Sequence, residues 1–154
     1  MSPASPEPQK VPPAAFKVAD YVRWSDVDAA GILCYGAYVR FFEIAETELF
    51  RAAGLPYGKV FEDLGFWLPR KALDFEFEAP AFLDDRLEVA IWVERFGTTS
   101  IRFAFEIAKL DVAGSRAAVT ARGHVAMVAV DRERLRPMPL PDRLRTALAG
   151  FRAG

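Results

Sequence analysis

The sequence is poor in residues that cross-link small proteins or bind metals. It contains one cysteine, Cys34, and one histidine, His124, among 154 residues. One cysteine cannot form an internal disulfide, so we expect a reducing, cytoplasmic compartment and interpret Cys34 as a buried, inert thiol. A zinc site would lack ligands of its preferred kinds. We therefore predict no metal and no cofactor, and we interpret His124 as a packed or surface residue of a strand.

Strong net charge and long apolar runs are also missing. Twenty lysines and arginines balance twenty-one aspartates and glutamates, for a formal net charge of -1, whereas a general nucleic-acid binder carries a basic excess. No apolar stretch is long enough to cross a bilayer, and the first 15 residues lack the basic segment and apolar run of a signal peptide. We predict no nucleic-acid partner and no membrane partner.

Hydrophobic residues, by contrast, make up 52% of the chain and aromatic residues 13%. A chain of this length and composition builds one compact domain with its own core. Residues 1–15 hold five prolines and few large apolar side chains, so burial would not offset the entropy lost on ordering them. We predict a flexible N-terminal extension over residues 1–15 and a single domain over residues 16–154.

Hydrophobic periodicity predicts the elements of this domain. One face of the segment 37–53 carries Phe41, Phe42, Ala45 and Leu49 at helical spacing, and Gly54 follows as a C-cap. Apolar and polar residues alternate in later segments, which is the period of a half-buried strand. We expect strands at 16–24, 73–77, 87–93, 101–107 and 116–130, and shorter helices at 57–64 and 142–148.

Short connections between the later strands favour antiparallel neighbours. We therefore predict an α+β fold in which one long central helix packs on a curved five-stranded antiparallel sheet. A single helix covers only part of one sheet face. Strand alternation points another set of residues away from it: Trp92, Ala104, Ala108, Ala126 and Val128. We expect some of that surface to meet a second copy in a homo-oligomer.

The turn Asp-Val-Asp-Ala-Ala-Gly, from Asp26 to Gly31, is the strongest candidate for chemistry. Aspartates in turns are most simply solvated, because their side chains bond the local backbone. Two features favour a site instead. Apolar residues follow the turn and should draw it toward the core, and the next helix has only Gly36 and Ala37 where a capping side chain would stand. Its free N–H groups would polarise a carbonyl that faces a buried carboxylate.

The segment Val22–Leu55 resembles the opening of the hot-dog-fold acyl-CoA thioesterases of the hydroxybenzoyl-CoA thioesterase type. The resemblance rests on the Asp-x-Asp-x-x-Gly turn and on the Tyr-x-x-Tyr start of a glutamate-rich helix, and it continues more loosely through residues 95–107 and 130–144. It implies a hot-dog fold and hydrolysis of a small acyl-CoA to a free acid and coenzyme A. It also implies a site at a homodimer interface, with dimers often pairing into homotetramers.

The resemblance also assigns roles to single residues. Asp28 takes the position of the catalytic carboxylate, as nucleophile or as general base. The helix start that binds the thioester oxygen is formed by Tyr35 and Gly36, with Ala37 beside them. Glu43 stands where some relatives bind a ring hydroxyl group. A thiol leaving group has a pKa near ~8.5, so it departs as thiolate without an obligatory general acid. One carboxylate would therefore suffice without a histidine.

The chain departs from this family pattern in the hairpin at 96–100, which lacks the basic cluster that holds the coenzyme phosphates in the hydroxybenzoyl-specific enzymes. Arg132, Arg134 and Arg136 are alternative phosphate ligands, although a solvated charged segment is the simpler interpretation. Asp26 would have a supporting or structural role. The acyl group stays open between aromatic and short aliphatic.

Two other functions stay open as well. A hot-dog enoyl-CoA hydratase or dehydratase would need a histidine near the helix, and His124 is the one available. A non-catalytic acyl-CoA-binding protein would need no catalytic group at all. One fold hosts several chemistries, so fold alone does not decide among the three.

Overall fold

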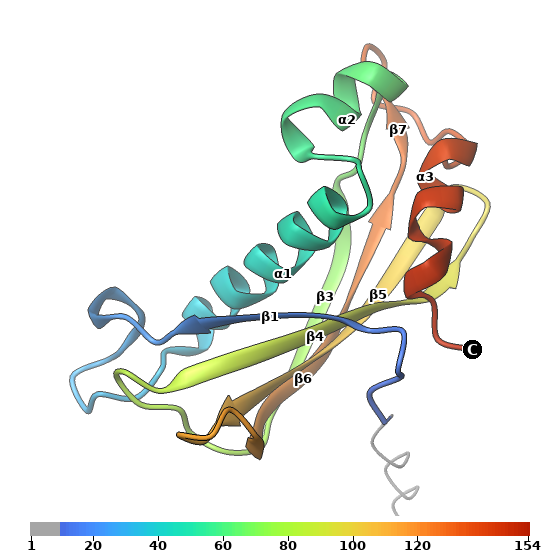
Figure 1. Cartoon of the computed structure of the whole chain (residues 1–154). Helices are drawn as coiled ribbons and strands as arrows, with labels where there is room; N and C mark the ends of the chain where they lie inside the picture. Colours follow the sequence, from blue (N-terminus) through green and yellow to red (C-terminus); the bar gives the residue numbers. More distant parts are fainter. Residues whose placement is uncertain (1–9) are drawn as a thin grey trace, which may run out of the picture.

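The computed structural model describes residues 10–154, and its centre is a five-stranded antiparallel sheet in the order β1-β4-β5-β6-β3 (Figure 1). The register pairs every neighbouring strand antiparallel. This confirms the predicted sheet. Its strands are β1 (Phe16–Tyr21), β3 (Arg70–Phe77), β4 (Arg86–Phe96), β5 (Ser100–Leu110) and β6 (Arg116–Val128).

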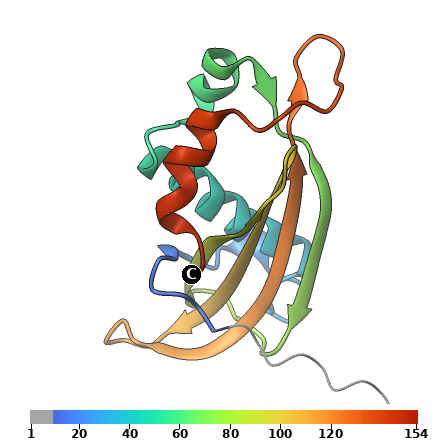
Figure 2. The same cartoon turned by 90° about the vertical axis from the view of Figure 1, so that its right-hand side faces the viewer.

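The long helix α1 (Tyr38–Ala52) lies along one face of the curved sheet (Figures 1 and 2). Phe41, Ala45 and Leu49 are fully buried between α1 and the strands, and each large apolar side chain contributes about 1.5–3 kcal/mol of burial. The chain leaves the helix through Gly54, whose φ of 77° is the left-handed conformation that glycine adopts without strain. The predicted central helix is confirmed.

A second helix covers the part of the same face that α1 leaves open. This is α3 (Asp142–Leu148), which buries Leu144 and Leu148 in the common core. Figure 2 shows α1 and α3 on the same side of the sheet. The predicted range of α3 is confirmed. Its role in completing the helical layer was not predicted, because the packing partners of a short amphipathic helix lie far away in the chain.

The remaining elements lie beyond the C-terminal end of α1. Helix α2 (Tyr57–Leu64) occupies its predicted range, and β2 (Phe66–Trp67) pairs with β7 (Val130–Asp131) in a small separate sheet. Neither short strand was predicted. Two expected strands are also shorter in the structure: β1 ends before the 3₁₀ turn Trp24–Asp26, and β6 ends before β7 begins.

The sheet face opposite α1 is covered in part by the chain's own ends. Trp92 is 1% exposed and packs with Ala104 against Val11, Ala15 and Ala153. Segments of the same chain therefore cover Trp92 and Ala104, whereas Ala126 and Val128 on this surface stay half-exposed. Residues 10–15 of the predicted extension contribute to this cover, while residues 1–9 lie outside the described residues.

Candidate active site

The turn after β1 holds the carboxylate of Asp28 in place through its own backbone. The N–H groups of Ala30 and Ile32 donate to Oδ1 of Asp28, at 2.8 and 3.2 Å. The backbone N–H of Asp28 donates to the carbonyl oxygen of Ile32 at 2.9 Å, and an antiparallel bridge joins Val27 to Leu33. Both bonds to the carboxylate use one oxygen, so Oδ2 is left for another partner.

The two aspartates of the turn differ in burial, and not in the expected way. Asp28 is exposed in the single chain, whereas Asp26 is 3% exposed. The expectation that the apolar residues after the turn would draw Asp28 into the core is wrong for one chain. Ile32 and Leu33 instead close the turn through backbone pairing. The buried carboxylate is that of Asp26, which pairs with a cation.

That partner is Arg40, which lies on the first turn of α1. Its Nε donates to Oδ1 of Asp26 at 2.8 Å, its Nη2 donates to Oδ2, and its Nη1 donates to Asp20 at 2.8 Å. Burial alone would raise the pKa of Asp26, but the hydrogen bonds and charge of Arg40 outweigh it and hold this pKa below its ordinary value. The carbonyl oxygen of Asp26 also accepts the N–H of Cys34 at 2.9 Å. Asp26 thus binds α1 through its carboxylate and binds Cys34, just before the helix, through its carbonyl oxygen.

The helix begins with a 3₁₀ turn, Tyr35–Ala37, directly after Cys34. Within the described chain, no side chain caps either this turn or α1. The N–H of Ala37 donates to the carbonyl of Cys34 at 3.0 Å, so the groups that remain for a ligand are the N–H groups of Tyr35 and Gly36. Of the three predicted helix-start residues, Ala37 is thus the one whose N–H is already used.

An open pocket of about 300 Å³ lies beside this helix start. It is lined by Tyr35 and Tyr38 from the helix, by Phe77 from the end of β3 and by neighbouring loop residues. The Tyr35 side chain is 82% exposed. Asp28 is not among the residues that line this pocket, so one chain alone does not enclose the predicted carboxylate and the predicted donors in one cavity.

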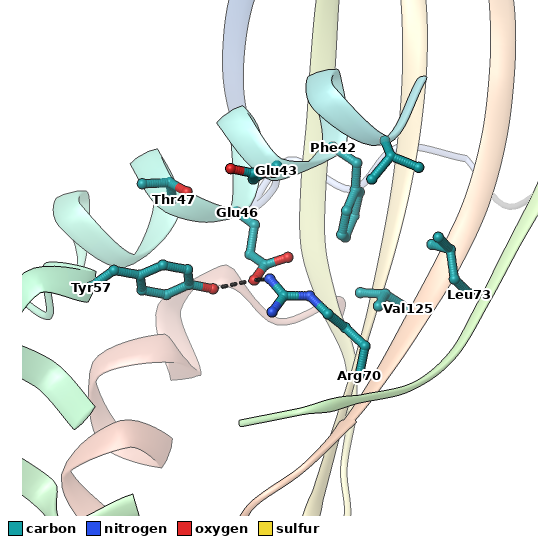
Figure 3. Close-up of a pocket in the computed structure, with 9 residues that line it drawn as sticks. Phe42, Glu43, Glu46, Thr47, Tyr57, Arg70, Leu73 and Val125 are labelled. Carbon is teal, nitrogen blue, oxygen red and sulfur yellow. Dashed lines mark hydrogen bonds and ion pairs between the residues drawn. The ribbon is translucent and has the colours of Figure 1, made fainter. Parts of the chain in front are cut away.

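Glu43 lies at a second cavity, of about 400 Å³, between α1 and β3 (Figure 3). It stands eight residues after Tyr35, which is about 12 Å along the helix axis. The structure therefore separates Glu43 from the helix start within one chain. Glu43 is exposed at the cavity, and Arg70, the first residue of β3, lies on the opposite wall.

A buried carboxylate that the sequence analysis missed forms the polar end of this second cavity. Glu46 is 0% exposed, and its Oε1 accepts hydrogen bonds from the Tyr57 hydroxyl and from Arg70 (Figure 3). Burial raises the pKa of Glu46, against the bond from Tyr57 and the charge of Arg70. One signal was available: Glu46 falls midway between Phe42 and Phe50 in the apolar stripe of α1, where a charge is out of place.

Comparison with known proteins places the chain in a family. The family model of the thioesterase-like superfamily matches residues 22–148. This chain belongs to the thioesterase-like superfamily. The match covers the turn, α1, α3 and every strand of the central sheet except β1, so it includes the residues that line both cavities. It confirms the resemblance to thioesterases that the turn and the helix start suggested.

Individual relatives of this thioesterase-like chain agree. It is 28% identical to the 1,4-dihydroxy-2-naphthoyl-CoA hydrolase of Thermosynechococcus vestitus. The alignment spans 127 residues, which cover 82% of this chain and 86% of that protein. It is 29% identical over 123 residues to the acyl-CoA thioester hydrolase YbgC of Escherichia coli, 80% of this chain and 87% of that protein. The predicted class of enzyme, a thioester hydrolase, is thereby confirmed.

Solved structures support the fold of this superfamily member. A 1,4-dihydroxy-2-naphthoyl-CoA thioesterase from Synechocystis matches with a TM-score of 0.79 at 22% identity, covering 88% of this chain and 96% of that one. The Dynemicin thioesterase matches with a TM-score of 0.80 at 18% identity, covering 91% and 99%. At these identities the likeness shows the fold, and the predicted hot-dog fold is confirmed.

The thioesterase-like chain keeps its histidine away from α1. His124 alternates along β6 with Val125, which lines the cavity beside α1, so His124 faces the other side of the sheet. There its Nδ1 lies 3.0 Å from Asp74, and Nε2 lies 3.6 Å from Glu94. His124 is therefore not at the helix, where a hot-dog hydratase would need its histidine. Residues 10–154 contain no cluster of histidine, cysteine and carboxylate side chains arranged to hold a metal ion.

The arginines considered for the coenzyme phosphates lie at the far end of the molecule. Arg132 stacks over the Trp67 ring at 4.5 Å, next to β2 and β7. The backbone N–H groups of Arg134 and Arg136 donate to Asp131 in the same loop. Within one chain this loop is separated from Tyr35 by the length of α1 (Figure 1). No described helix is long and apolar enough to span a membrane.

Proposed function

We propose that this protein hydrolyses a small acyl-CoA thioester to a free acid and coenzyme A, with Asp28 as the catalytic carboxylate. The observation that carries the proposal is the fixed turn. Oδ1 of Asp28 is held by two backbone N–H groups, and Asp26 ties the turn to α1 through Arg40. The proposal takes Oδ2 of Asp28 as the reactive oxygen and the uncapped helix start as its electrophilic partner.

The proposed chemistry uses the helix start as the electrophilic partner. The thioester carbonyl oxygen accepts from the N–H groups of Tyr35 and Gly36, whose charge is reinforced by the helix dipole. Negative charge develops on that oxygen during attack, and one well-placed N–H donor in such a hole contributes about 3–4 kcal/mol. The thiolate of coenzyme A then leaves without an acid catalyst, because its conjugate thiol has a pKa near ~8.5.

Two routes satisfy this arrangement. In the first, Oδ2 of Asp28 attacks the carbonyl carbon, the C–S bond breaks, and water hydrolyses the resulting mixed anhydride. In the second, Asp28 takes a proton from water while the water oxygen attacks the carbonyl. Both give the same products, and both need Asp28 ionised.

A second copy of the chain completes the site in this proposal. β3 is one of the two edge strands of the sheet, and its free edge offers unpaired backbone groups. Leu73, 44% exposed, and Phe77, 54% exposed, lie on the face of this strand that lines the two cavities. This edge replaces the Trp92 surface as the proposed homodimer interface. A homotetramer of two such dimers rests on the family resemblance, and a cytoplasmic location rests on the single cysteine; both remain proposals.

Twofold symmetry gives this interface a specific consequence. Antiparallel pairing of two β3 strands about their midpoint sets the Phe77 end of one strand beside the Arg70 end of the other. The pocket at one helix start would then adjoin the Glu43 cavity of the second copy. That arrangement would shield Asp28 and give the acyl group a place to lie, which one chain does not provide.

Thiol release from a panel of aromatic and short aliphatic acyl-CoA substrates tests the reaction. The proposal predicts enzymatic release of free coenzyme A from at least one small acyl-CoA. Tight binding of every substrate with no product would instead identify a non-catalytic acyl-CoA-binding protein. Hydration of an enoyl-CoA that is lost in His124→Ala would identify a hydratase.

A further inference from the structure

A third cavity, of about 570 Å³, lies on the sheet face opposite α1. Residues 10–13, which precede β1, form one wall of it. Side chains from β1, β5 and β6 form the other wall, and these are Lys17, Glu106, Arg116 and Arg122. The neighbours of Glu106 along β5, Phe105 and Ile107, are buried in the core beneath α1, so Glu106 faces away from α1. The sheet therefore separates this cavity from the two cavities beside the helix.

The strand register explains why the sheet is hollow at this place. One row of neighbouring residues crosses four strands on this face: Lys17, Ala90, Glu106 and Arg122. Ala90 has only a methyl group, so the surface is low between the longer side chains of Lys17 and Glu106. Val11 packs against the cluster that contains Ala90. Pro12 and Pro13 have no N–H group to pair with a strand, so this segment crosses the face without extending the sheet.

Glu106 is the one carboxylate that lines this cavity, and both of its oxygens are engaged. It is 4% exposed, Oε1 accepts from Nη2 of Arg116, and Oε2 accepts from Nε of Arg122 at 2.7 Å. Arg122 also donates through Nη1 to Glu78, and Nε of Arg116 lies 3.5 Å from Glu88. A guanidinium group has five N–H donors. Nη2 of Arg122 and Nη1 of Arg116 therefore keep donors that no described residue accepts.

The two lysines of the lining add further donors. Lys10 is exposed and forms no ion pair with any carboxylate of residues 10–154. Nζ of Lys17 lies 3.9 Å from Oε1 of Glu88, which is too far for a hydrogen bond. The lining thus holds four cations and one carboxylate, while Glu78 and Glu88 lie outside it. The cavity has donors and positive charge in excess, and it is short of acceptors.

We propose that this cavity binds a phosphorylated small molecule. A phosphate group is anionic and offers an acceptor on each free oxygen, and arginine and lysine are the side chains that bind it in proteins. Lys10 would close the site from the segment before β1, and Lys17, Arg116 and Arg122 would hold the phosphate from the sheet. Val11, Pro12 and Pro13 give the organic part of the ligand an apolar wall. The proposal does not depend on the thioesterase function, because its residues lie on the other face of the sheet.

Calorimetric titration with pyrophosphate and with ADP, at constant ionic strength, tests the site. We expect both to bind wild type, and we expect Lys10→Gln and Lys17→Gln each to weaken binding by about three- to tenfold. Both lysines are exposed, so neither change should alter the fold. The matched control is Lys59→Gln, an exposed lysine of α2 outside the lining, which should bind as wild type does. No binding to wild type, or equal affinity in all four proteins, would overturn the proposal.

Tryptic cleavage after Lys10 gives a second readout that simple charge screening would not move. A bound phosphate draws Lys10 onto the sheet, so pyrophosphate should slow this cleavage about fivefold or more. Sodium chloride at the same ionic strength should not slow it, and a reporter peptide shows whether pyrophosphate affects the protease itself. Cleavage at the same rate with and without pyrophosphate would overturn the part of Lys10, and with it the site as proposed.

Coenzyme A is the third probe, because it also carries a diphosphate. If Lys17→Gln weakens binding of coenzyme A as much as binding of pyrophosphate, the coenzyme's own phosphates occupy the cavity. If the variant weakens binding of pyrophosphate and ADP alone, the cavity serves a separate phosphorylated ligand. Either result supports a phosphate site on this face, and an affinity for all three probes that Lys17→Gln leaves unchanged contradicts it.

Discussion

Arg40 and Asp26 form a partly buried ion pair that joins the start of α1 to the turn carrying Asp28. The pair couples two segments fourteen residues apart, and its carboxylate is almost fully enclosed. Through this pair the turn that carries Asp28 is tied to the first turn of α1. The catalytic proposal therefore depends on a residue that does no chemistry.

Removal of the enclosed carboxylate should be costly for stability. Asp26→Ala removes the acceptor of Nε and Nη2 of Arg40 in a partly buried position and leaves only Asp20 to pair with the guanidinium, so we expect the free energy of unfolding to fall by about 2–4 kcal/mol. Urea unfolding followed by circular dichroism measures this change. Glu48→Ala breaks an exposed pair and should shift stability by less than about 1 kcal/mol. Equal effects of the two substitutions would contradict the structural role of Asp26.

The same pair should make the fold sensitive to acid. Arg40 holds the pKa of Asp26 and of Asp20 below their ordinary values, in spite of burial. A carboxyl group whose pKa is lower in the folded state stabilises the fold above its unfolded pKa, near ~3.9, and loses that contribution as the pH falls through the folded pKa. We expect wild type to lose stability below about pH 4 more steeply than Asp26→Asn. Melting temperatures measured between pH 2 and pH 7 test this. The same dependence of melting temperature on pH in both proteins would refute it.

Two glycines should respond in opposite directions to alanine. A Cβ atom on Gly123 in β6 would lie 2.0 Å from the carbonyl oxygen of Asp74 in β3, so Gly123→Ala should cost about 3 kcal/mol or more. Gly58 lies inside α2 with open space around it, and Gly58→Ala should stabilise by about 0.4–1 kcal/mol. Thermal melting compares the two variants with wild type. A tolerated Gly123→Ala would mean that β3 and β6 lie farther apart than described.

The edge strand β3 should control the oligomeric state. Leu73 lines the cavity beside α1 and is still 44% exposed, and a lysine on an unpaired edge strand prevents strand pairing between copies. We expect wild type to sediment as a dimer or a larger assembly and Leu73→Lys to sediment as a monomer. The comparison is Lys71→Glu, which changes an exposed residue of the same strand and removes no apolar side chain. A monomeric wild type would contradict the interface and, with it, the shielding of Asp28.

The sequence supported the fold well because the fold depends on local patterns. Phe41, Ala45 and Leu49 repeat at helical spacing, and they are the residues that α1 buries. Periodicity gave the order of the elements along the chain, but it did not give the order of the strands within the sheet. The cover over Trp92 could not be predicted, because it comes from the two ends of the chain and involves no local pattern.

The site was harder to predict, since it depends on which polar group finds a partner. Asp26 and Asp28 stand two residues apart in the same turn, yet only Asp26 meets Arg40 and is buried. Glu46 interrupts the apolar stripe of α1, but its partners Tyr57 and Arg70 come from later segments that spacing does not identify. Both outcomes are set by contacts between distant segments, which spacing along the chain does not reveal.

The most direct measurement is kcat/KM of Asp28→Asn against wild type, on whichever acyl-CoA wild type hydrolyses fastest. Asparagine keeps the oxygen that accepts from Ala30 and Ile32, so the turn should hold its shape while the nucleophile or base is lost. The account predicts a fall of about 10²–10⁴-fold with unchanged melting temperature and assembly. Turnover within about twofold of wild type in a correctly folded Asp28→Asn protein would contradict it.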